Sequence, residues 1–111
     1  MMLSIREYFT ADGLNPFRGW LDTLDLPVKA RVQARVLRFE MGNLGDHKSV
    51  GGGVWEARMT FSAGYRIYFG KDAHSTIVLL VGGAKSSQSQ DISRAKGFWR
   101  DYLETKPHGK T

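Results

Sequence analysis

Residues 53–70, GVWEARMTFSAGYRIYFG, contain two short runs rich in aromatic and branched side chains, separated by turn residues. Runs of this kind on either side of a glycine-containing turn are typical of a β-hairpin. A three-residue loop over residues 62–64, with Gly64 in the left-handed conformation, pairs Met59 with Ile67 and Ala57 with Phe69. We expect this register because it gathers one apolar face, whereas a two-residue loop would mix polar and apolar side chains on both faces.

The other face of this hairpin is polar. In the expected register Thr60 lies opposite Arg66, Arg58 lies opposite Tyr68, and Glu56 shares their face. Two arginines and a tyrosine accompanied by a single acid suit the binding of a phosphate and the stacking of a base. A sheet with helices on one side also commonly leaves its other side wet without any function, and this alternative stays open.

Upstream of the hairpin, the sequence predicts a strand and two helices. Leu3 and Ile5 indicate a strand over residues 2–9. Asn15 is a typical helix N-cap, and Pro16 suits the first helical position that follows it. A second helix is expected over residues 27–42, followed by a glycine-rich loop over residues 42–53.

Downstream of the hairpin, residues 75–83, STIVLLVGG, form a continuous apolar run, for which we expect a central strand buried on both faces. A last helix follows Ser87, whose spacing to Gln90 resembles a capping box. Its inward stripe would consist of Ile92, Ala95, Trp99, Tyr102 and Leu103. The expected fold is α+β, with two N-terminal helices packed on a twisted, mainly antiparallel four-stranded sheet in the order β-α-α-β-β-β-α. We expect one domain over residues 1–104 and a flexible tail over residues 105–111.

The composition is basic and excludes several classes of site. The formal net charge is +5, and residues 29–66 contribute +4 of it, with seven basic and three acidic side chains. Such clustering suits a nucleic acid or an acidic protein as partner. The absence of cysteine excludes disulfides and thiolate sites, and the three histidines, His47, His74 and His108, lack metal-ligand spacing. Because no apolar run has the length of a membrane span and no signal-peptide layout is present, we expect a cytoplasmic protein.

Arg31, Arg35 and Arg38 form a basic stripe on the second expected helix. A solvated helix face is the ordinary explanation for such a stripe. The functional alternative is contact with a nucleic acid, including ribosomal RNA.

Five motifs spread over about 85 residues resemble those of one toxin family. They are NPFRGWLDTL at residues 15–24, GNLGD at 42–46, GVWEAR at 53–58, GYRIYF at 64–69 and GGAKSSQSQDI at 82–92. In content and order they are similar to the RelE/ParE toxin superfamily, in its phage-derived Gp49-like, HigB-type branch. The resemblance implies a RelE-like fold and an addiction-module toxin. A small antitoxin, often with a helix-turn-helix domain, would neutralise the toxin, and operator DNA would be bound only through the complex with this antitoxin. RelE- and HigB-type members commonly cleave mRNA, frequently on the ribosome, whereas ParE-type members poison DNA gyrase and are not enzymes.

The resemblance also implies roles in RNA cleavage that needs no metal or other cofactor. Arg58 and Arg66 would bind the scissile phosphate, and Lys85 would stabilise it or protonate the leaving oxygen. Lys48 or His47 would accept the proton of the attacking 2′-hydroxyl. The hairpin register and the basic stripe add the residues expected to bind substrate, which are Tyr68, Thr60, Arg31, Arg35 and Arg38.

Two positions depart from the family pattern. Ile92 falls near the place where some RelE-type members carry a tyrosine, and Ala84 stands where many related sequences have an acid. The identities of the general acid and base therefore stay open. Three functions remain to be distinguished: an mRNA endoribonuclease, a gyrase poison, and an inactive module that binds nucleic acid.

Overall fold

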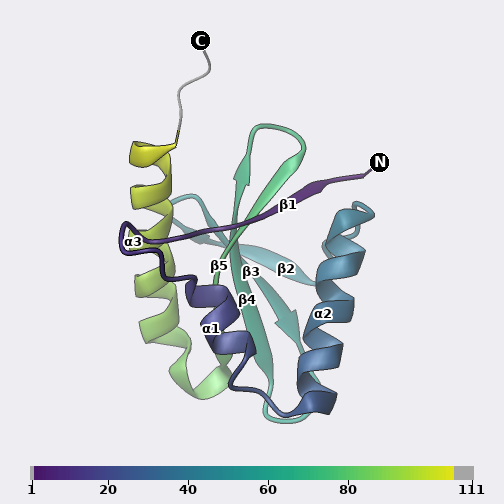
Figure 1. The fold of residues 1–111 in the computed structure, drawn as a ribbon. Helices are drawn as coiled ribbons and strands as arrows, with labels where there is room; N and C mark the ends of the chain where they lie inside the picture. Colours follow the sequence, from purple (N-terminus) through teal and green to yellow (C-terminus); the bar gives the residue numbers. More distant parts are fainter. Residues whose placement is uncertain (1, 107–111) are drawn as a thin grey trace.

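The chain is built around a five-stranded sheet, and the computed structural model describes residues 2–106 (Figure 1). Along the chain the elements are β1 (Ser4–Glu7), α1 (Pro16–Leu21), α2 (Leu26–Glu40), β2 (His47–Gly51), β3 (Val54–Met59), β4 (Tyr65–Asp72), β5 (Thr76–Ala84), the 3₁₀ turn η1 (Lys85–Ser87) and α3 (Gln88–Thr105). None of these helices combines the length and the hydrophobicity that crossing a membrane requires.

The sheet is mixed, with strand order β1-β5-β4-β3-β2. β1 runs parallel to β5, and the other neighbours are antiparallel. The predicted α+β class is confirmed, but the predicted four-stranded sheet is wrong. Residues 47–51, expected in a loop, form the edge strand β2 through main-chain pairing with β3. Their sequence, HKSVG, lacks the apolar alternation by which strands are recognised.

Helices cover both faces of the sheet, so the expectation of one wet face is also wrong. On one face, α1 and α2 bury Phe17, Leu21, Val32 and Phe39 against β3, β4 and β5. On the other face, α3 buries Ala95, Trp99 and Tyr102 against the same three strands. Figure 1 shows α3 and α2 at opposite sides of the molecule. The predicted burial of β5 on both faces is confirmed.

The β3–β4 hairpin has a longer turn than the sequence predicts. Met59 pairs with Tyr65 and Arg58 with Arg66, which leaves residues 60–64 as the loop. Ser62 adopts a left-handed conformation (φ 55°) as well as Gly64 (φ 78°), so the turn is wider than a three-residue loop. Since the pairing differs from the prediction by two residues, every side chain keeps its predicted face.

One of the two predicted capping interactions at helix N-termini is confirmed and the other is wrong. Asn15 caps α1 as expected, since its Oδ1 accepts the Arg18 amide at 2.9 Å. Ser87 forms no capping box; its hydroxyl donates to Asp91 instead. Leu103, expected to point inward, is 40% exposed.

The last helix extends one residue into the stretch predicted to be a flexible tail. Thr105 still belongs to α3, and Lys106 lies 2.9 Å from Asp72, with which it forms an ion pair. Residues 107–111, which include His108, lie outside the described residues.

Candidate phosphate-binding site

Three cationic side chains line one hollow at the turn of the β3–β4 hairpin. Arg58 comes from the end of β3, Arg66 from the start of β4, and Lys85 from η1. The hollow has a volume of about 410 Å³, and Asp46, Met59, Thr60 and the turn residues 62–64 complete its lining. A main-chain hydrogen bond joins η1 to the hairpin turn, because the Lys85 amide donates to the Gly64 carbonyl at 2.9 Å. The structure therefore brings together the three cations for which the sequence predicted a phosphate-binding role.

Arg66 is held from behind by a buried carboxylate. Glu56 is fully buried, and its Oε2 lies 3.5 Å from Arg66 Nε, whose own side chain is 10% exposed. The same oxygen accepts the Tyr68 hydroxyl at 3.0 Å and the Gln88 Nε2 at 2.9 Å. Both hydrogen bonds hold the Glu56 carboxylate, one from β4 and one from α3, whereas Glu56 Oε1 and Arg66 Nε have no hydrogen-bond partner among the described residues. The charge of Glu56 therefore holds the Arg66 side chain near this carboxylate before any ligand arrives.

Tyr68 is at the centre of this cluster rather than at the surface. It is fully buried beneath α3, where burial and the neighbouring Glu56 carboxylate raise the pKa of its hydroxyl above the usual range. The predicted stacking of a base on Tyr68 is therefore wrong, because no face of its ring is accessible.

Arg58 is more accessible and has a different partner. Its side chain is 41% exposed, and its Nε lies 3.5 Å from Oδ2 of Asp46, which is 60% exposed. Arg58 is also directly opposite Arg66 in the strand register. Like charges at such positions repel each other, and the arrangement becomes favourable when an anion lies between them. Two arginines that face each other at the mouth of a hollow can thus bind an anion between them.

Arg35 fixes the two segments that carry Arg58 and Asp46. Its Nη1 donates to the Arg58 carbonyl at 2.9 Å, and its Nη2 to the carbonyls of Leu44 and Asp46 at 3.1 and 3.0 Å. Gly45 is needed here, because it has φ +64° and a Cβ would lie 2.7 Å from Arg35 Nη2. Burial, with a contribution from the Arg38 charge, lowers the pKa of Arg35 from its ordinary value. The Arg35 guanidinium therefore donates to the main chain, and its predicted contact with substrate stays a prediction.

All three arginines of the stripe line a second, adjoining hollow. It has a volume of about 610 Å³, and Arg31, Arg38 and Phe61 line its outer part. Arg31 lies over the Phe61 ring, with 4.6 Å from its guanidinium carbon to the ring centroid. Asp46, Arg58, Met59 and Thr60 line both hollows. The two hollows therefore form neighbouring parts of one basic groove between α2 and the hairpin turn.

The two bases suggested by the sequence do not line this groove. His47 pairs with Ala57 on the face covered by α1 and α2, where its ring packs against Trp55 and Phe69. Its Nδ1 is 2.8 Å from the Gly45 carbonyl oxygen. Lys48 is exposed on β2, opposite Glu56, and does not contribute to the lining of either hollow.

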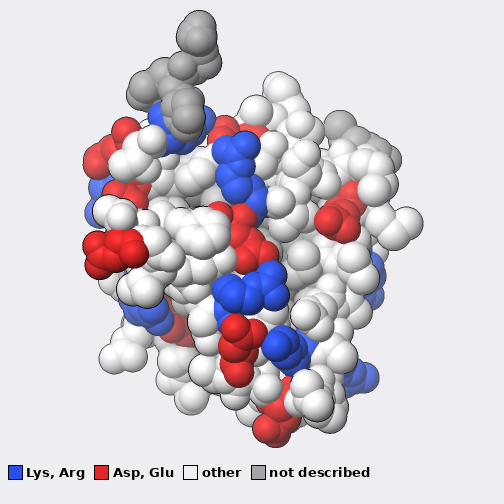
Figure 2. All heavy atoms as spheres, in the orientation of Figure 1, with Lys and Arg blue, Asp and Glu red and all other residues white. Residues whose placement is uncertain are grey.

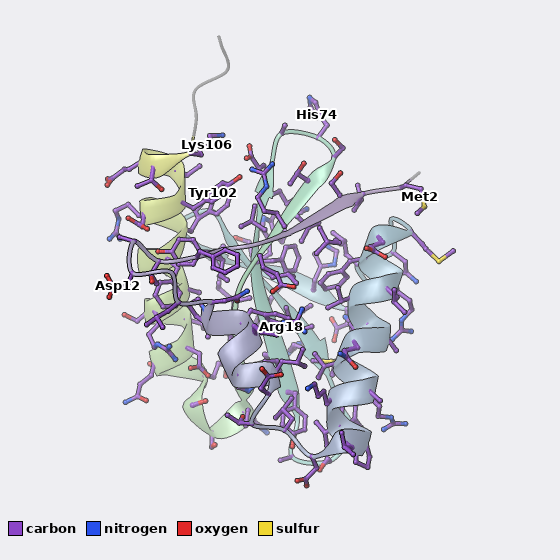
Figure 3. The ribbon with its side chains drawn as sticks, in the orientation of Figure 1. Met2, Asp12, Arg18, His74, Tyr102 and Lys106 are labelled. Carbon is purple, nitrogen blue, oxygen red and sulfur yellow. The ribbon has the colours of Figure 1, made fainter. Side chains whose placement is uncertain are left out.

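Several other charged side chains line neither hollow. His74 is in the β4–β5 turn, at the end of β4 opposite to Arg66, where Figure 3 also places Tyr102 and Lys106 nearby. On the face shown in Figure 2 basic and acidic side chains are interspersed; Arg18, for example, pairs with Glu7 at 2.6 Å. Within residues 2–106 no group of three histidine or acidic side chains is arranged to hold a metal ion.

The sequence analysis placed Glu56 on the face of the arginines but missed Asp46 and Gln88 as polar residues of the site. Asp46 lies in the stretch of residues 42–53 for which the sequence predicts a loop. A signal for it exists once residues 47–51 are paired with β3, because the Arg58 amide then donates to the Asp46 carbonyl at 2.9 Å. Gln88 carries no such signal, since its approach to Glu56 depends on how α3 lies on the sheet.

The chain is 43% identical over 81 residues to an uncharacterized protein of Haemophilus influenzae, an alignment that covers 72% of this chain and 82% of that protein. No model of a known protein family matches the chain.

Proposed function

We propose that this chain, which belongs to the same family as the Haemophilus influenzae protein, is an endoribonuclease toxin of a type II toxin–antitoxin module. In this proposal the fold is RelE-like and HigB-type, and the toxin stops growth by cleaving mRNA in the cytoplasm, on or off the ribosome. A cognate antitoxin with a helix-turn-helix domain would hold it inactive. The proposal is supported by the five sequence motifs and by the positions of the residues that they contain.

The single observation that carries the proposal is the convergence of Arg58, Arg66 and Lys85 on one hollow. Attack of a 2′-hydroxyl on the adjacent phosphate adds negative charge to the phosphorus oxygens in the transition state. Fixed cations at that place lower the barrier without having to reorganise during the reaction. Arg66 meets this requirement best, because the buried Glu56 holds it in place.

The adjoining hollow supports a polynucleotide rather than a small anion as substrate. Arg31 and Arg38 would contact phosphates of the same strand next to the one bound by Arg58 and Arg66. Contacts of this kind depend on charge and not on base identity, so they add affinity that falls with salt. Thr60, exposed between the two hollows, is placed to contact the sugar–phosphate backbone.

The decisive experiment is induction of the chain in bacteria, followed by primer extension on abundant mRNAs. We expect new 5′ ends within minutes together with growth arrest, both lost in Arg66→Ala and strongly reduced in Arg58→Ala and Lys85→Ala. Arg100→Ala, an exposed arginine on α3, is the matched control and should arrest growth like the wild type. Intact transcripts accompanied by DNA damage would refute the proposal in favour of a gyrase poison. Absence of both effects would favour an inactive binding module.

A further inference from the structure

RNA cleavage of the proposed kind needs a proton acceptor beside the phosphate. The 2′-hydroxyl is attached next to the scissile phosphate, so its base must lie within hydrogen-bond reach of a group adjacent to the phosphate-binding cations. His47 is on the opposite face of the sheet, and Lys48 lines neither hollow. Glu56 is fully buried behind Arg66 and cannot contact a substrate. The base must therefore be found among the other side chains of the groove.

Asp46 is the carboxylate that lines both hollows. Its Oδ2 is 3.5 Å from Arg58 Nε, and its side chain is largely exposed to the groove. Its main chain is fixed by two hydrogen bonds to its carbonyl, from the Arg58 amide at 2.9 Å and from Arg35 Nη2 at 3.0 Å. Thus the backbone of Asp46 is rigidly tied to the phosphate-binding strand, while its carboxylate is accessible.

We propose that Asp46 is the general base of the reaction, an inference that rests on the proposed ribonuclease function. The Asp46 carboxylate takes the proton of the 2′-hydroxyl, and the oxygen so activated forms a bond to phosphorus. The bond from phosphorus to the 5′-oxygen breaks, and the leaving oxygen takes a proton from the Lys85 ammonium. The products are a 2′,3′-cyclic phosphate and a 5′-hydroxyl. Proton exchange with water then restores Asp46 and Lys85.

A base at this position has an effect on binding opposite to its effect on catalysis. Asp46 places a negative charge among the cations that bind phosphate, and it partly neutralises Arg58. Removing that charge strengthens the attraction of the groove for a polyanion. A residue that served only to bind RNA or to support the fold would lower affinity and cleavage together.

The test compares Asp46→Asn with the wild-type chain on a single-stranded RNA oligonucleotide, with and without added ribosomes. Binding is measured separately on single-stranded DNA of the same sequence, which lacks every attacking hydroxyl. We expect Asp46→Asn to lower kcat by about 100-fold or more, the range for a general base, with a Kd for DNA that is unchanged or lower. Asp46→Glu, which keeps the carboxylate, should recover part of the activity. Asp12→Asn, an exposed acid in the loop before α1 (Figure 3), is the control and should behave as wild type.

Three results would overturn the inference. Cleavage by Asp46→Asn within about twofold of the wild-type rate would show that the base lies elsewhere. A parallel loss of DNA binding and cleavage would show that Asp46 acts in binding or folding. If the wild type itself binds the oligonucleotides but leaves the RNA intact under both conditions, the proposed ribonuclease function fails, and the role of Asp46 fails with it.

Discussion

Replacing Arg35 tests whether its guanidinium is part of the structure or of an RNA-binding surface. The side chain is 6% exposed and donates to three main-chain carbonyls, those of Leu44, Asp46 and Arg58. Hydrogen bonds from a charged donor contribute about 1.5–3 kcal/mol each to stability. Part of this is regained in Arg35→Ala, because the acceptors lie near the surface and can bind water and because the cost of burying the charge disappears.

We therefore expect Arg35→Ala to lower the free energy of unfolding by about 3 kcal/mol, which corresponds to a drop in Tm of about 15 °C for a domain of this size. The stability of Arg35→Lys should lie between that of the wild type and that of Arg35→Ala, since one ammonium cannot reproduce the forked donors of a guanidinium. The assay is urea denaturation followed by tryptophan fluorescence. Arg38→Ala, one turn along α2 and exposed, is the matched control and should change stability by no more than about 0.5 kcal/mol.

Binding to single-stranded nucleic acid should give the opposite ranking at temperatures where both variants are folded. Arg38→Ala removes a cation from the groove and should weaken binding directly. Equal stability of the Arg35 and Arg38 variants would refute the assignment of Arg35 as a buried tie between α2 and the hairpin.

Two further outcomes can be measured on the same purified chain. Gly83→Ala should destabilise the fold by about 2 kcal/mol or more, because a Cβ there would overlap the Asp91 carboxylate. Gly97→Ala, on α3 with open space around it, should stabilise the fold by about 0.5–1 kcal/mol. The midpoints of urea denaturation test both changes. Burial and the Asp101 carboxylate, which accepts the Tyr8 hydroxyl at 2.5 Å, raise the pKa of Tyr8 from 10.0 to about 12. Its neutral form is favoured in the folded state, so this contribution to stability is complete below pH 10 and is lost as the pH rises through 12. Tyr8→Phe should lose less stability than the wild type between pH 9 and 12, and identical pH profiles would contradict the raised pKa.

The hairpin shows how far alternation in a sequence determines structure. Its two faces were predicted correctly although the register was wrong, because a slip of two residues leaves the alternation intact. The turn could not be predicted in detail, since Ser62 adopts a left-handed conformation that only glycine, asparagine and aspartate signal from sequence. β2 was missed for a related reason: an edge strand can be held by main-chain pairing without apolar side chains of its own.

The position of α3 was less accessible from sequence, although one signal for it was present. A strand with a continuous apolar run, as in β5, requires cover on both faces, and the inward stripe of the last helix supplies that cover. Combining the two observations predicts a sheet between two helical layers. What still could not be predicted is which polar residues α3 would bury: Glu56 and Tyr68 are partners in the observed strand register, and Gln88 of α3 donates to the same Glu56 oxygen.

The cations of the site could be predicted from the sequence, but the residues that surround and hold them could not. Arg58, Arg66 and Lys85 converge as expected because strand register and chain order constrain them. Arg35 was assigned to a solvated stripe because of its spacing to Arg31 and Arg38. Its spacing to Val32 and Phe39 places it equally well on the buried stripe, and sequence alone does not decide between the two.

The two arginines that face each other across the hairpin differ in how firmly they are held, and this difference assigns them different parts in the proposed reaction. The ion pair of Arg66 with Glu56 is buried and supported by two hydrogen bonds, so separating it would leave an uncompensated charge in the interior. The pair of Arg58 with Asp46 is exposed, and pairs of that kind contribute at most about 1 kcal/mol. An incoming phosphate can therefore replace Asp46 as the partner of Arg58 but cannot replace Glu56 as the partner of Arg66. Arg66 would then act as a fixed anchor, and binding of the phosphate to Arg58 would itself release the Asp46 carboxylate beside the 2′-hydroxyl.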